Sequence, residues 1–296
     1  MSSKTNILIC RSVSFVSGII LAVMSLWNAE MGRSIGPVFG CAVTHIAAIP
    51  IILVLLICKV WGRPNHESGL LPRKKIYYGV GIISAGIVVL SNFLIPHIGL
   101  ALFISSIIAG NLITSFAADF FSFQSTIHFQ HGSRQYVAMF LALSGVVVSQ
   151  MAVGRQFANP LSVFPYTLLA LGNGALVAVS RVMNSNLAGS VGMTRGLFIN
   201  HAVAGLLALV IGVVFIPSHI DCFKPYLLLA SVMGIAFVVA GNYTIPRIGV
   251  LVTATWVLLG QLAAGWILSP APHLLLSATG TGLVALAVYF LFAKSV

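Results

Sequence analysis

The sequence predicts an all-α membrane protein with about ten transmembrane helices, arranged as two five-helix repeats of opposite topology. Three observations lead to this prediction. The chain is 59% hydrophobic and only 6% charged, whereas a soluble domain carries roughly 25% charged residues. Apolar segments long enough to cross a bilayer, which takes about 20 residues, follow one another from end to end. In addition, motifs of the first half return at a fixed distance in the second.

Ten apolar segments are separated by charged residues, prolines and glycines, and each is predicted to form one helix. They lie at residues 8–30, 36–59, 76–96, 99–121, 135–153, 163–188, 194–216, 225–246, 249–268 and 273–293. The first segment follows Lys4 and Arg11, which is also typical of a cleaved signal peptide. Because this segment has a counterpart inside the chain, we interpret it as a retained helix.

Basic residues collect in alternate loops, as the positive-inside rule describes. If the N-terminus is inside, the outer loops hold only Arg33, Arg155 and Lys224. The inner side then holds Lys4, Lys59, Arg63, Arg73, Lys74, Lys75, Arg134, Arg195, Arg247 and Lys294. We therefore expect a multi-pass protein of the bacterial cytoplasmic (inner) membrane with both termini in the cytoplasm. The net charge of +11 does not indicate a nucleic-acid partner, because the basic residues form no single patch with interleaved aromatic residues.

An internal repeat divides the chain into residues 1–155 and 156–296. The segment from Asn92 to Gly99 (NFLIPHIG) returns 150 residues later, from Asn242 to Gly249, as NYTIPRIG. At an offset of 156, three further pairs match: Gly18 and Gly174, Asn28 and Asn184, His45 and His201. Five helices is an odd number, so the second repeat enters the membrane from the opposite side. Secondary transporters with inverted repeats bind substrate near the midplane, between the repeats.

Three of these motifs resemble one family. They are the glycine ten residues before an asparagine near the start of each half, the Pro-x-Ile-Gly hairpin, and the Gly-[Asn/Gln]-Leu that follows it. Together they are similar to the YdcZ-type branch of the drug/metabolite transporter superfamily, and this sequence looks like two of its five-helix units fused. The resemblance covers nearly the whole chain. It implies a ten-helix transporter fold with both termini inside, and no particular substrate.

Arg181 is the first candidate site residue, because ionisable groups within the hydrocarbon are costly and are functional hypotheses by default. It lies about seven residues from the inner end of the sixth segment, roughly 10 Å deep at about 1.5 Å per residue. Asn173 and Asn184 share its helical face, and Ser25 and Asn28 lie on the equivalent face in the first half. The guanidinium donors suit a carboxylate or phosphate. The alternative is an arginine that extends to the lipid headgroups.

His45 and His201 are the second candidate, as a pair near the midplane that carries protons during transport, since histidine titrates near neutral pH. The alternative is a hydrogen-bonded pair that only fixes helix packing. No metal site is expected, because no Cys, Asp or Glu completes a ligand set around them, and no cofactor is expected.

Further polar residues lie within apolar segments. Asn111 and Gln261 each follow a glycine in the middle of a segment, and they suit either substrate contact or hydrogen bonding between helices. Trp256, in the same segment as Gln261, is a further candidate substrate contact. Asn92 and Asn242 precede a proline by four residues, and we interpret them as parts of tight hairpins, because proline has no amide proton to donate.

These observations predict a secondary transporter that exports a small polar metabolite, with an anionic one favoured by Arg181, as a monomer or homodimer in the lipid bilayer. A flippase for a lipid or polyprenyl-phosphate headgroup, and a non-transporting scaffold or sensor, are the alternatives. Exchange of cationic drugs is disfavoured, because Glu30 and Asp119 lie near segment ends rather than at a segment centre. No motif of an enzyme, such as HExxH or GxSxG, is present in the sequence, so we expect no catalytic residues.

Overall fold

The computed structural model describes residues 3–60, 75–120, 133–154, 160–214, 224–268 and 274–292. Within these ranges the chain is helical, and strands are absent from them. The α-helices are α1 (Ser3–Ile35), α2 (Pro37–Ile57), α3 (Gly79–Phe120), α4 (Ser133–Gly154), α5 (Pro160–Val191), α6 (Met193–Val214), α7 (Leu229–Ile248), α8 (Val250–Leu268) and α9 (Leu274–Phe292). Two short 3₁₀ helices, η1 (Lys75–Tyr78) and η2 (Pro225–Leu228), precede α3 and α7.

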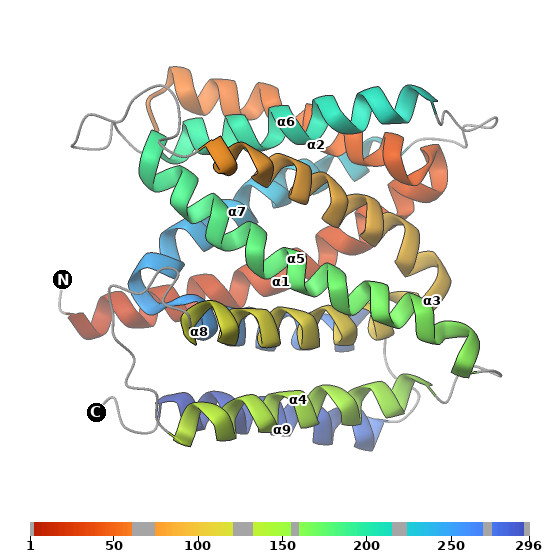
Figure 1. Ribbon diagram of the computed structural model, residues 1–296, viewed down its shortest axis with the longest axis vertical. Helices are drawn as coiled ribbons and strands as arrows, with labels where there is room; N and C mark the ends of the chain where they lie inside the picture. The colour runs from red at the N-terminus through yellow and green to blue at the C-terminus, as the bar shows by residue number, and fades with distance from the viewer. Residues whose placement is uncertain are drawn as a thin grey trace.

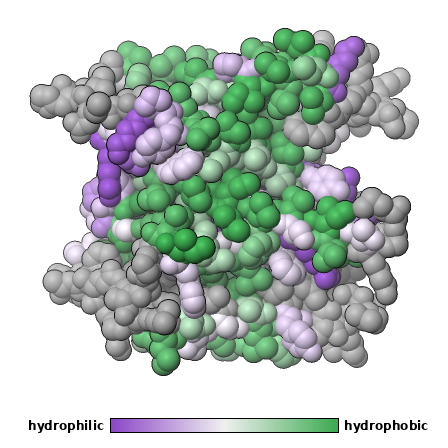
Figure 2. All heavy atoms as spheres, turned by 180° about the vertical axis from the view of Figure 1, so that it is seen from behind, coloured by the Kyte–Doolittle hydropathy of each residue, from purple (hydrophilic) through white to green (hydrophobic). Residues whose placement is uncertain are grey.

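By length and composition, 7 helices of the described ranges can cross a membrane. α4 and α9 are not among these 7 helices. Their apolar stretches are shorter and lie at Tyr136–Val148 and Ala278–Ala287. Figure 1 shows α4 beside α9 at one end of the molecule and α2 beside α6 at the other, with the remaining helices between them. Large apolar side chains face outward along the helices, with Leu275 84% and Ile267 82% exposed. Figure 2 shows that hydrophobic residues dominate the visible face, as a lipid-facing surface requires.

The 42 residues of α3 would extend about 60 Å at about 1.5 Å per residue, twice the roughly 30 Å of a hydrocarbon core. The helix is broken at Gly99, whose φ of 75° and ψ of 159° are not helical. Its two arms, residues 79–98 and 100–120, correspond to the third and fourth predicted segments. Pro96, which cannot donate an amide, precedes the break.

Single glycines make the same joint at four places. Gly36 lies between α1 and α2, Gly192 between α5 and α6, and Gly249 between α7 and α8, with φ of 87°, 92° and 81°. Together with Gly99 they form two pairs that match at the repeat offsets of 156 and 150. Their backbone conformation is nearly exclusive to glycine. A glycine at this position, which ends the Pro-x-Ile-Gly motif at Gly99 and Gly249, therefore makes a joint between consecutive helices rather than a longer loop.

Helices of the two halves cross with their backbones in contact. A methyl group at Gly18 in α1 would overlap the carbonyl of Val257 in α8, and one at Gly260 in α8 would overlap the carbonyl of Phe15. The same reciprocal contact joins α3 to α5, through Gly110 and Gly174. Small residues at such crossings let helices approach closely in a membrane, where apolar burial alone gives little driving force.

Gly174→Ala is expected to destabilise the protein, because its new methyl group would overlap the carbonyl of Ile107. Overpacking of this kind typically costs about 1–3 kcal/mol, which lowers the melting temperature measured by differential scanning fluorimetry in detergent. Gly172→Ala, on the same helix, is the matched control, since nothing lies within 4 Å of the added carbon. Equal melting temperatures for the two variants would contradict the close crossing of α3 and α5.

Candidate functional site

An internal cavity lies between the two halves of the chain and is bounded by α1, α2, α3, α5, α6 and α7. Its volume of about 70 Å³ is enough for a few water molecules, each of which needs roughly 10–15 Å³ by the same measure. Apolar side chains supply most of the wall. The polar lining residues are Asn28, Thr44, His45, Ser84, Ser180, Arg181, Asn184, Asn200, His201 and Asn242.

Arg181 is buried in this wall, with 5% of its surface exposed. Its guanidinium carbon lies 4.8 Å from the ring centroid of Phe237, which provides a cation–π contact. Its Nε and Nη2 atoms have no hydrogen-bond partner among the described residues. Burying a charge without a partner is expensive.

His45 of α2 and His201 of α6 meet in the cavity wall, with their Nδ1 atoms 3.1 Å apart. Both rings are buried, and their centroids are 5.0 Å apart. While both rings are neutral, one Nδ1–H donates to the other Nδ1, so the two rings adopt different tautomers. Neither Nε2 atom has a partner among the described residues. The repeat thus brings its two histidines into one hydrogen-bonded pair.

Residues of α1 and α5 extend the polar lining on either side of this pair. Thr44 Oγ1 donates toward Asn28 Oδ1 at 3.0 Å and the Gly40 carbonyl at 2.9 Å. Asn184 Nδ2 donates to the carbonyl and hydroxyl oxygens of Ser180, at 3.0 and 3.2 Å. Ser180 in turn lies 3.3 Å from the Ser84 hydroxyl. Five of the expected residues therefore line one cavity: Asn28, His45, Arg181, Asn184 and His201.

The other expected substrate contacts lie outside the cavity lining. Ser25 donates to the Leu21 carbonyl at 2.7 Å within its own helix. Asn173 lies about two turns from Arg181 along the helix and donates to the Ile87 carbonyl at 3.3 Å and the Ser91 hydroxyl at 3.2 Å. The Ser25 bond lies within α1, and the Asn173 bonds join α5 to α3.

The three expected residues near the α3–α5 and α1–α8 crossings also lie apart from the cavity. Asn111 accepts a hydrogen bond from the Ser115 hydroxyl at 3.1 Å. Gln261 is buried in α8, one residue after Gly260. Trp256 packs beside the buried residues Cys10, Ile248 and Val252.

Several lining residues are not expected from the sequence. Ser84 and Ser180 carry no signal of their own, since serine is common where membrane helices pack. The one sequence feature that connects Ser180 to the cavity is its spacing from Asn184, because residues four apart share a helical face beside Arg181. Asn242, whose motif indicates a hairpin residue, lines the cavity, and its Oδ1 has no partner among the described residues. Its counterpart Asn92 lies outside the cavity lining and donates to the Pro37 carbonyl of α2 at 2.9 Å.

The apolar helices, with a cavity between them that polar side chains help to line, define a multi-pass membrane protein with an internal site. The chain belongs to the family described as "Putative inner membrane exporter, YdcZ", whose model matches residues 9–148 and again residues 165–293. The protein is therefore a member of an inner-membrane exporter family and carries two of its units in one chain. The family is described as an exporter family and not as an enzyme family.

One solved crystal structure is similar in fold over 100% of both chains, with a TM-score of 0.68 and 16% sequence identity. No curated protein matches the chain. The two comparisons give a family and a fold, and neither names a transported substrate.

Proposed function

We propose that this protein is a secondary transporter that exports a small anionic metabolite across the inner membrane by alternating access. The observation that carries the proposal is the buried guanidinium of Arg181, whose Nε and Nη2 have no partner among the described residues, in a cavity between the halves. A scaffold or sensor needs no such cavity, and it would be expected to satisfy its buried polar groups.

A ten-helix, 5+5 inverted repeat supports this mechanism. The division into residues 1–155 and 156–296 falls between the two family matches. If each arm of α3 counts as one helix, the described helices number five in each half, because α3 is interrupted at Gly99 as α7 and α8 are at Gly249. An odd number of helices in each half would invert the second half, and the distribution of Lys and Arg favours both termini in the cytoplasm. Movement of one half against the other would then expose the cavity to each side in turn.

The His45–His201 pair is proposed to couple transport to protons. With both rings neutral, the shared hydrogen bond of 3.1 Å leaves one Nε2 without a proton. This nitrogen can take up a proton and release it again as the cavity opens to water. The two rings come from different halves, so a change in their separation accompanies any movement of the halves.

A flippase for a lipid-phosphate headgroup is the second candidate. A larger cavity of about 460 Å³ lies between α3 and α5, lined mainly by apolar residues such as Ala117, Val179 and Val182. It lies close to Arg181 along α5 and suits an acyl chain better than a soluble metabolite. Accumulation of a lipid phosphate, rather than a soluble anion, in cells without the protein would favour this function.

Arg181→Ala is expected to reduce export at least tenfold, because it removes the single cationic side chain of the cavity lining. The measurement is an untargeted comparison of anionic metabolites in the medium and cytoplasm of cells with the wild-type protein, with the variant and without the protein. Arg181→Lys is the matched control, which keeps the charge and loses the planar fork, and intermediate export is expected. Full export by the alanine variant would remove Arg181 from the site.

His45→Gln and His201→Gln are each expected to abolish uphill transport driven by a pH gradient in proteoliposomes, while exchange of labelled for unlabelled metabolite continues. Glutamine keeps a hydrogen-bonding side chain and cannot titrate near neutral pH. Histidines that served packing alone would give a different result, in which gradient-driven transport, exchange and melting temperature fall together.

A further inference from the structure

The geometry around Arg181 points to a substrate class: a short aliphatic monocarboxylate, bearing at most one hydroxyl or keto group and no ammonium group. This inference rests on the proposed function and narrows it. Nε and Nη2, the two unpaired nitrogens, lie on the same edge of a guanidinium. Two parallel N–H donors on one edge match the two oxygens of a carboxylate. Phe237 covers a face of the guanidinium at 4.8 Å, so a ligand would have to reach Nε and Nη2 along this edge.

Two glycines of α7 keep space beside the polar groups. A methyl group at Gly241 would lie 4.0 Å from Nε of Arg181, and one at Gly234 would lie 3.9 Å from Cε1 of His201. Both glycines line the cavity, and they are seven residues apart on one helical face. A larger residue at Gly241 would take up the space that a bound carboxylate needs.

The charges of the lining match a single negative charge. Arg181 is the one lysine or arginine among the residues that line the cavity, and none of these residues is Asp or Glu. An ammonium group would be buried without a carboxylate partner, which is costly. While both histidines of the lining are neutral, a second carboxylate would likewise lack a cation. These costs exclude amino acids, dicarboxylates and cationic drugs from the favoured class.

The remaining contacts favour a small and largely apolar substrate. Leu21, Met24, Ile87, Val88 and Val177 form part of the wall, and the cavity measures about 70 Å³. With both rings neutral, the histidine pair has one Nε2 that carries a proton and one that does not. One hydroxyl or keto oxygen of the substrate can bind there, in either the donor or the acceptor role.

The test is isothermal titration calorimetry of the purified full-length protein with four probes: isovalerate, its neutral analogue isovaleramide, valine, which adds an ammonium group, and succinate, which adds a carboxylate. Isovalerate is expected to bind at least tenfold more tightly than the other three. Gly241→Ala is expected to weaken isovalerate binding at least fivefold, whereas Gly172→Ala, outside the cavity lining, leaves it unchanged.

Valine or succinate binding as tightly as isovalerate, or no binding of isovalerate, would overturn the substrate class. The proposed function fails on a different result, namely export from cells that does not depend on Arg181. Binding of succinate together with Arg181-dependent export would therefore refute this inference and leave the anion exporter in place.

A second and independent observation concerns two apolar clusters at opposite ends of the site, which we propose are its gates. The first cluster follows Asn28 along α1 and consists of Met31, Ile35 and Leu227 with Trp27, Phe39 and Val43. The second follows Asn184 along α5 and consists of Val80, Leu187 and Val191 with Tyr77, Met183 and Ile199. Five members of each cluster match at the repeat offsets, such as Met31 with Leu187 and Leu227 with Tyr77.

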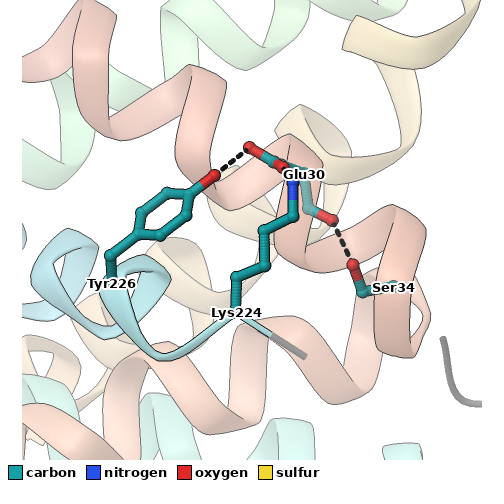
Figure 3. A network of polar contacts seen from close by, with 4 residues as sticks. All are labelled: Glu30, Ser34, Lys224 and Tyr226. Carbon is teal, nitrogen blue, oxygen red and sulfur yellow. Dashed lines mark hydrogen bonds and ion pairs between the residues drawn. The ribbon is translucent and has the colours of Figure 1, made fainter. Parts of the chain in front are cut away.

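The first cluster carries a polar latch that contains an ion pair. Figure 3 shows Glu30 of α1 between Lys224 and Tyr226, with Lys224 Nζ 2.6 Å from Oε1 and the Tyr226 hydroxyl donating to Oε2 at 3.0 Å. Tyr226 also packs edge-on against Trp27, with ring centroids 5.8 Å apart. The repeat places Asn186 and Ile76 at the positions of Glu30 and Tyr226, and these side chains cannot form an ion pair.

The latch joins α1 of the first half to Lys224 and η2, which precede α7 in the second half. It therefore holds the first gate shut and biases the transporter toward opening at the second gate. The ion pair is partly exposed, at 34% and 55%, and such pairs shift an equilibrium by a factor of at most about five.

Labelling of Met24→Cys, which lies in the cavity wall, in a chain whose four native cysteines are replaced by serine, tests the latch. Glu30→Gln is expected to increase labelling by a membrane-impermeant maleimide severalfold from the side at which α1 ends, and to decrease it from the other side. Ser34→Ala is the control, because Ser34 donates only to the Glu30 backbone carbonyl, at 3.1 Å. Unchanged labelling from both sides in Glu30→Gln would overturn the gate assignment.

Discussion

The close approach of helix backbones at glycine is the contact on which the rest of the structure depends. Inside a bilayer, apolar side chains gain little by leaving lipid for protein, so packing contacts hold helices together. Gly18 and Gly260 provide such a contact between α1 and α8, and Gly110 and Gly174 provide one between α3 and α5. Each contact joins a helix of one half to a helix of the other. The cavity lies between the halves that these contacts join, and both halves contribute helices to its wall.

The cavity combines a nearly symmetric frame with asymmetric chemistry. His45 and His201 are equivalent in the repeat and meet each other directly at 3.1 Å. Asn28 and Asn184 are also equivalent and also line the cavity, but with different partners. Arg181 and Phe237 belong to the second half alone. A symmetric frame allows similar movements at its two ends, while Arg181 is the one lysine or arginine of the cavity lining.

Repeat offsets and the cost of burying charge make much of this arrangement predictable from sequence. The offset of 156 pairs His45 with His201, and the rarity of intramembrane arginine identifies Arg181. Sequence cannot decide which of Asn173 and Asn184 lines the cavity, because both lie on one helical face and only their depth separates them. Ser84, Ser180 and Phe237 carry no distinguishing pattern, since each is an ordinary residue of membrane helices. Asn242 escapes detection because its proline motif is identical in form to that of Asn92, whose amide donates to the Pro37 carbonyl of α2.

Ser25 occupies, in the first repeat, the position that Arg181 occupies in the second. Two identical five-helix units meeting as a dimer would have to place the same residue at both positions, and hence two like charges or none around a shared centre. Fusion of the units into one chain removes that restriction. After duplication, each copy could diverge alone, and an odd charge became compatible with an internal twofold frame. Fusion of the two units into one chain therefore permits a single charged side chain in the cavity wall. A symmetric dimer of the single unit cannot have one, because every residue occurs twice in it.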